Sequence, residues 1–273
     1  MALLGIAWFS FGLIVGSFLN VVIFRYHTGR TVRGRSACLS CGHTLRPIEL
    51  IPVISYLFQK GKCRSCGSRV SFQYPLVEIM GGLLFLGVYA QTLPVVSTAV
   101  ALVAGSLLIV IGVYDVRHKI IPDAFVYALA ALGLGALFLG PDLRLVTPSL
   151  LAILAGPLFA LPFLALSLIS SGRWMGLGDA KLALPLGWLL GAGESVTAFM
   201  LAFWIGTVAV ASAALARTLA RAFSLGKLFP EGKTLTMETE VPFAPFLIAG
   251  AVVAHALSLS GAELLALFSV PLL

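Results

Sequence analysis

Six stretches of this sequence contain no Asp, Glu, Lys or Arg, and each is at least 18 residues long. They cover residues 2–24, 79–114, 124–141, 145–172, 195–216 and 241–262. A helix needs about 20 apolar residues to cross the hydrocarbon core of a bilayer. Only 11% of the 273 residues are charged, whereas soluble domains carry about 25%. The chain is therefore expected to cross a membrane several times.

The apolar stretches predict about eight transmembrane helices. Residues 79–114 are long enough for two spans with a turn at 91–94, and a shorter apolar stretch over 182–193 adds another. We interpret residues 2–24 as a true span, because positive charges follow it and no small-residue cleavage site ends it. The fold class is thus an all-α polytopic membrane protein. Its predicted spans are 3–24, 76–91, 95–114, 122–140, 147–170, 180–191, 194–216 and 243–269.

The positive charges predict the orientation. Of the 18 Lys and Arg residues, 17 lie in four alternating loops, and the exception is Arg144. Cytoplasmic loops carry an excess of Lys and Arg, so these four loops are expected in the cytoplasm. The net charge of +7 is explained by this topology and by a surface that faces anionic lipid, and no nucleic-acid partner is expected. The four loops are 25–75, 115–121, 171–181 and 217–241.

All four cysteines lie in the loop 25–75, as two Cys-x-x-C pairs that are each followed by glycine. This spacing is typical of a structural Zn²⁺ held by four thiolates. A loop of about 50 residues is too small to build a good core, and a metal or disulfides usually stabilise such a module. Disulfides are disfavoured because the predicted location is the reducing cytoplasm. The predicted zinc ligands are Cys38, Cys41, Cys63 and Cys66.

Two aspartates stand out among the ionisable residues near membrane depth. Asp115 ends a predicted span, and Asp179 begins another after Gly176 and Gly178. Both are predicted at the cytoplasmic membrane face, where two neighbouring carboxylates could share one proton while the ionised one activates water. The two glycines would let an extended substrate backbone approach. An Asp at a helix start is often only a cap, and this interpretation fits Asp123. For Asp115 and Asp179, the spacing alone does not decide between a catalytic pair and two separate structural roles.

Over nearly its whole length the sequence resembles the bacterial prepilin peptidases, also called type IV leader peptidases, which are G-x-G-D aspartic proteases. The ordered set of matching segments is far more specific than G-x-G-D alone. Ala244 is the one departure, because the family usually has glycine there. The matching segments are residues 16–22 with Arg25, the two Cys pairs, residues 55–57 and 61–64, residues 74–78, residues 115–123, residues 176–179 and residues 242–246.

The resemblance implies a function and its residues. Asp115 and Asp179 would be the catalytic aspartates, and Asp123 occupies a position that is Asp or Asn in the family. The substrate would be a type IV prepilin or pseudopilin, cleaved after the Gly that precedes its hydrophobic helix. Many members then methylate the new N-terminus, usually Phe, with S-adenosylmethionine. The family connects methylation with the N-terminal region, which makes Asn20, Arg25 and Glu78 candidates for the methyl-donor site.

The expected organisation has three parts: a first transmembrane helix over 1–24, a cytoplasmic zinc-binding domain over 25–75 and a transmembrane aspartic peptidase domain over 76–273. The residues are also compatible with two other functions. An ion- or proton-coupled transporter would use intramembrane aspartates, but the aspartates cluster at one face and no inverted repeat is evident. A non-catalytic scaffold of a secretion or pilus machine would have no use for two glycines beside a membrane-edge aspartate.

Overall fold

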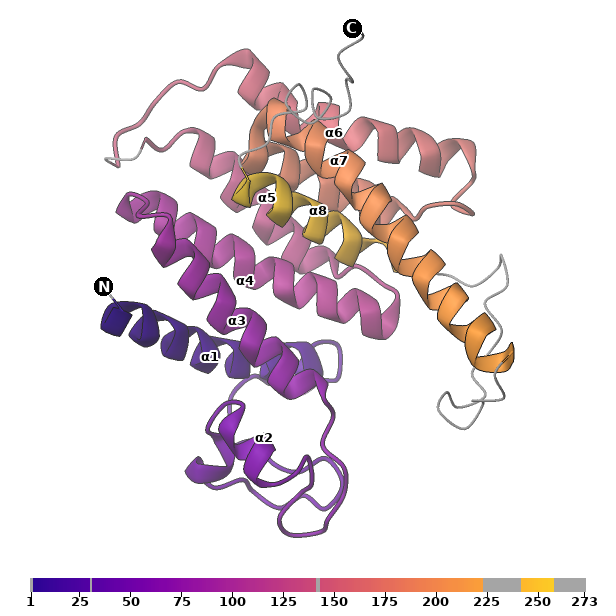
Figure 1. Ribbon diagram of the computed structural model, residues 1–273. Helices are drawn as coiled ribbons and strands as arrows, with labels where there is room; N and C mark the ends of the chain where they lie inside the picture. The colour runs from indigo at the N-terminus through magenta and orange to yellow at the C-terminus, as the bar shows by residue number, and fades with distance from the viewer. Residues whose placement is uncertain (1, 30, 141–142, 223–241, 258–273) are drawn as a thin grey trace, which may run out of the picture. The chain divides into compact units, whose positions relative to one another are not determined.

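The computed structural model describes residues 2–29, 31–140, 143–222 and 242–257 (Figure 1). Within these ranges the regular elements are all helices, joined by loops that contain three isolated β-bridges. The helices are α1 (Ala2–Arg25), the 3₁₀ helix η1 (Pro47–Leu50), α2 (Ile54–Phe58), α3 (Gln73–Ala90), α4 (Val95–His118), α5 (Asp123–Leu137), α6 (Leu150–Ile169), α7 (Leu177–Ala222) and α8 (Ala244–Ala256).

The predicted all-α, multi-pass membrane fold is confirmed. Five described helices are long and apolar enough to cross a membrane, namely α1, α3, α4, α6 and residues 177–216 of α7, and the shorter α5 and α8 are apolar as well. Gly191 has φ 74° and ψ 173°, which divides α7 into two helices at a kink. Counting both halves of α7 gives eight apolar segments. Part of the predicted loop 217–241 and of the last predicted span, 243–269, lies outside the described residues.

The chain forms two compact units, one of residues 1–114 and 138–146 and the other of residues 115–137 and 147–273. In the first unit α1 and α3 pack along each other through glycines. A methyl group on Gly12 or Gly16 of α1 would overlap the backbone of α3. In a membrane no hydrophobic effect drives helices together, so they associate through close van der Waals packing, which small residues allow. The glycines therefore hold α1 and α3 together as a closely packed pair.

The second unit is built around α7, which packs against α5, α6 and α8. Pro157 in α6 cannot donate to the carbonyl of Ile153, four residues earlier. The indole N–H of Trp188 in α7 donates to that carbonyl at 2.9 Å instead. The Ile153 carbonyl, which has lost its partner within the helix, is thus hydrogen-bonded by a neighbouring helix. Such a bond is needed because no water is present in the bilayer core to provide one.

Candidate functional site

The two cysteine pairs fold as two equivalent knuckles. In each, the glycine that follows the second cysteine donates its N–H to the carbonyl of the first, from Gly42 to Cys38 and from Gly67 to Cys63, both at 2.9 Å. Both glycines have positive φ, 72° and 71°, which a residue with a side chain rarely adopts. The sequence signal of Cys-x-x-Cys-Gly therefore corresponds to one turn geometry used twice.

The four sulfurs converge to within 4.8 Å of one another. Sulfurs of a tetrahedral site with metal–sulfur bonds of about 2.3 Å lie about 3.8 Å apart, and the Sγ atoms of Cys38 and Cys66 are 4.0 Å apart. The pKa of the Cys38 thiol falls from 9.0 to about 6, because the backbone N–H groups of Cys41 and Ser40 donate to its sulfur. All four are free thiols, so the cluster could bind a metal ion.

Asp115 lies in the last turn of α4 and is buried, with 4% of its surface exposed. A carboxylate at the C-terminal end of a helix is disfavoured by the helix dipole. Here the backbone N–H of Ala244, the first residue of α8, donates to it. That N–H is one of the unsatisfied donors of a helix start. The other carboxylate oxygen, Oδ2, is buried and has no hydrogen-bond partner among the described residues.

Asp179 lies in the first turn of α7 and is also buried. Its carboxylate accepts the backbone N–H of Gly176, the residue that precedes the helix. This contact is the side-chain half of a capping box, in which the third helical residue reaches back to the N-cap. The carboxylates of Asp179 and Asp115 are close enough to interact electrostatically. The second unit thus brings the two predicted aspartates together, each beside a helix start.

The position of Ala244 depends on an aromatic cluster in the core of the second unit. Phe243 precedes α8, and its ring centroid lies 5.1 Å from that of Phe203 in α7 and 6.1 Å from that of Phe163 in α6. Phe163 is fully buried. Packing of Phe243 therefore fixes the start of α8 against α6 and α7. The role of the Ala244 N–H was not predicted from the sequence, because a backbone donor leaves no signal in residue type.

Asp123 has different surroundings from the aspartate pair, whereas Gly176 and Gly178 directly precede Asp179. Asp123 begins α5, and both of its carboxylate oxygens accept from Nζ of Lys181, at 2.9 and 3.0 Å, in an exposed ion pair between α5 and α7. A methyl group on Gly178 would press on the side chain of Ile121, at 3.1 Å. Around Gly176 the space is open apart from the Gly178 nitrogen, 3.9 Å away.

Glu78 ties three segments of the first unit together. Its side chain is buried in α3, and its Oε2 accepts the N–H of Val53 at 2.7 Å. Its carboxylate also accepts a hydrogen bond from Ser17 of α1. Val53 has φ 60° and ψ −49°, and the N–H of Ile54 donates to the carbonyl of Pro52. This is a γ-turn with positive φ, which is rare and strained, all the more for a β-branched residue. Glu78 thus holds the loop 25–75, which carries the cysteine cluster and is called the metal module below, against the α1–α3 pair.

The other two candidates for a methyl-donor site are also engaged within the protein. The amide nitrogen of Asn20 donates to the carbonyl of Tyr74 at 3.1 Å, while its buried Oδ1 has no partner among the described residues. The guanidinium of Arg25 donates to three loop carbonyls, those of Thr31, Arg33 and Arg35. Together with the contacts of Glu78, these bonds give each of the three residues a structural role.

Comparison with known proteins agrees with the geometry. Residues 10–92 match the Bacterial Peptidase A24 N-terminal domain, and residues 102–211 match the Type IV leader peptidase family. A protein of Bacillus subtilis named prepilin leader peptidase/N-methyltransferase is 34% identical, over 90% of this chain and 92% of its own length. Proteins with the same name from Dichelobacter nodosus and Burkholderia pseudomallei are 32% and 30% identical, over 88% of this chain in each case and 87% and 81% of their own lengths. No solved structure matches significantly. The chain belongs to the type IV leader peptidase family.

Proposed function

We propose that this protein is a membrane aspartic endopeptidase that removes the leader from type IV prepilins or pseudopilins. The observation that carries the proposal is the pair of buried carboxylates, Asp115 and Asp179, which interact within one compact unit. Buried carboxylates are costly at membrane depth and are rarely retained without a function. The family match over residues 102–211 includes both aspartates.

The proposed mechanism uses one proton shared between the two carboxyl groups. The ionised carboxylate takes a proton from a water molecule, which attacks the carbonyl carbon of the scissile peptide, while the protonated carboxyl donates to the carbonyl oxygen. The N–H groups of Ala244 and Gly176 would each hold one carboxylate oxygen in place. Oδ2 of Asp115, which has no described partner, would remain available for water or substrate.

We further propose that the new N-terminal residue of the substrate, usually Phe, is then N-methylated, as the names of the relatives indicate. S-adenosylmethionine would supply the methyl group. Asn20, Arg25 and Glu78 stay the proposed candidates for its site, and their polar groups also make contacts within the protein. No methyl-transfer step is assigned to any one of them.

The cysteine cluster is proposed to hold one structural Zn²⁺ through Cys38, Cys41, Cys63 and Cys66. Four thiolates leave no open coordination position, so the ion would stabilise the module rather than take part in cleavage. About one zinc per chain is expected in protein purified under reducing conditions. Serine at any of the four positions should lower that content and increase proteolysis of the module. Zinc-free protein with a stable module would refute this assignment.

The proposed location is the bacterial inner membrane, with the metal module and the aspartates on the cytoplasmic side, as the loop charges indicate. The proposed division is a first helix over 1–24, the zinc module over 25–75 and the peptidase domain over 76–273.

One assay tests the function. Purified protein in detergent is incubated with a prepilin and S-adenosylmethionine, and the product is weighed by mass spectrometry. Loss of the leader mass is expected, and a further gain of one methyl group would establish methylation. Prepilin that stays intact when the enzyme is in molar excess would refute the peptidase proposal.

A further inference from the structure

The metal module exposes apolar side chains in a segment outside the candidate spans. In α2, Tyr56 packs inward, with its ring centroid 6.4 Å from that of Phe72 and its hydroxyl close to Gly61. Its neighbours point out, so that Leu57 is 67% exposed and Phe58 84% exposed. We name this surface the η1–α2 edge. Its exposed apolar residues are Ile48, Leu50, Ile51, Ile54, Leu57 and Phe58.

Charged groups at the surface of the same segment are all positive. Glu49 is the one acidic residue between positions 25 and 75, and it is buried, with Oε2 accepting the N–H of Arg46 at 2.8 Å. After α2, by contrast, the cationic side chains of Lys60, Lys62 and Arg64 are exposed. A partner for this surface must therefore accept apolar side chains and carry negative charge.

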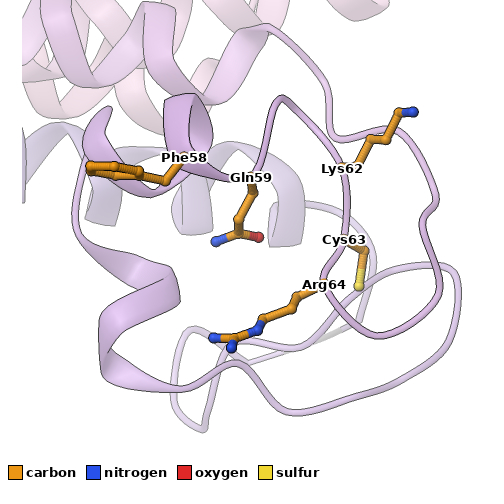
Figure 2. Close-up of a pocket in the computed structure, with 5 residues that line it drawn as sticks. All are labelled: Phe58, Gln59, Lys62, Cys63 and Arg64. Carbon is orange, nitrogen blue, oxygen red and sulfur yellow. The ribbon is translucent and has the colours of Figure 1, made fainter.

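A cavity of about 330 Å³ joins the apolar and the cationic residues. It is lined by Phe58, Gln59, Lys62, Cys63 and Arg64, and Figure 2 shows the Gln59 amide and the Arg64 guanidinium extending into the same space. These two groups offer N–H donors, and Lys62 adds a positive charge. Phe58 provides an apolar wall. The combination of donors, positive charge and an aromatic ring matches a phospholipid headgroup with the start of its acyl chains.

The connections of the module place it near a bilayer. It lies between α1 and α3, both of which are long and apolar enough to span a membrane and belong to the same unit as the module. Surfaces that combine large apolar side chains with Lys and Arg bind at the membrane interface, and anionic lipid strengthens the binding. We propose that the η1–α2 edge inserts into the headgroup region of an anionic leaflet, with Lys60, Lys62 and Arg64 facing the lipid phosphates.

The full-length protein tests this proposal in nanodiscs. Hydrogen–deuterium exchange of backbone amides over residues 47–64 is compared between discs of phosphatidylcholine alone and discs that also contain phosphatidylglycerol. Several-fold slower exchange is expected with the anionic lipid. Leu57→Asp and Phe58→Asp should each remove this protection, and the double variant Lys60→Gln/Lys62→Gln should remove the difference between the two lipids. Metal content shows that each variant retains a folded module.

Leu39→Asp is the matched control. Leu39 is 66% exposed, nearly as much as Leu57, but it lies in the first cysteine knuckle, so this variant should keep the protection. The proposal is overturned if exchange is equal in both kinds of disc, or if Leu39→Asp and Leu57→Asp act alike. Protection that appears only when prepilin is added would make the edge a protein-docking surface, and would overturn the lipid proposal while leaving the peptidase proposal intact.

Discussion

At the scale of single residues, the three aspartates differ in their surroundings. Asp115 and Asp179 are buried and interact with each other, whereas Asp123 is exposed and paired with Lys181. Asn preserves the size of Asp but serves as neither acid nor base. We therefore expect Asp115→Asn and Asp179→Asn each to lower the rate of prepilin cleavage by at least about a hundredfold, as measured by mass spectrometry, with unchanged zinc content.

Asp123→Asn is the control for these two variants. It removes one exposed ion pair with Lys181, and such pairs contribute about 0–1 kcal/mol to folding. Most of the cleavage activity should therefore remain. Inactive Asp123→Asn protein beside active Asp115→Asn protein would show that the catalytic pair has been assigned to the wrong residues.

Glu78 allows a second test at this scale. Ala in place of Glu78 would leave the N–H of Val53 and the hydroxyl of Ser17 without their acceptor, and an unsatisfied buried group costs about 1–3 kcal/mol. Glu78→Ala should therefore lower the thermal stability and speed up hydrogen exchange over residues 51–55. Glu78→Gln keeps an acceptor oxygen and should recover much of the loss.

The methylation assay decides between the two roles of Glu78. If Glu78 only holds the module, cleavage and methylation per folded molecule should decline together, in step with stability. Glu78→Ala protein of unchanged stability that cleaves but no longer methylates would instead make Glu78 part of the methyl-donor site.

Residue type explains which parts of the site could be predicted. Four cysteines at knuckle spacing and two aspartates at span ends are rare in an apolar chain, so their chemistry is visible in the sequence. The Ala244 N–H and the strained turn at Val53 are backbone features, and an ordinary Ala or Val gives no sign of them. They depend on how α8 and α3 pack, which only the tertiary structure shows.

At the scale of the helices, the α1–α3 contact depends on glycine. A methyl group on Gly81 would lie 2.5 Å from the carbonyl oxygen of Gly12 and 3.0 Å from Cα of Gly16, both backbone atoms. Since backbone cannot move aside as a side chain can, the helices would have to separate. Gly81→Ala should therefore destabilise the protein by about 1–3 kcal/mol, visible as a lower unfolding temperature in detergent.

Gly87 provides a matched control in the same helix. A methyl group there meets no atom within 4 Å, and Ala is favoured over Gly in a helix by up to about 1 kcal/mol. Gly87→Ala should leave the unfolding temperature unchanged or raise it. Equal destabilisation by the two substitutions would show that helix flexibility, rather than the close contact, is what these glycines provide.

Helix positions were largely predictable because span length and loop charge are both set by the membrane. The predicted turn at 91–94 lies where α3 ends and α4 begins, and the predicted break between the sixth and seventh spans corresponds to the kink at Gly191. The continuation of α7 to Ala222 was not predicted. Charge indicates where a chain leaves the bilayer, but a helix can continue into water beyond that point.

At the scale of the whole molecule, topology decides on which side of the membrane the aspartates lie. α6 has 20 residues, and at 1.5 Å per residue it is about 30 Å long, enough to cross the hydrocarbon core. The loops before and after it should therefore lie on opposite sides of the membrane. Thr147 precedes α6 and Trp174 follows it, and both are exposed.

A membrane-impermeant maleimide reagent tests this topology on intact spheroplasts. Thr147→Cys should react from outside, and Trp174→Cys should react only after lysis. The unmodified chain is the control, because its four cysteines lie in a loop predicted inside and should stay unlabelled until lysis. Labelling of both substituted positions from outside would mean that α6 does not cross. Reversed labelling would place the positively charged loops outside. Asp115, Asp179 and the metal module would then be outside too, because all three lie in or beside these loops.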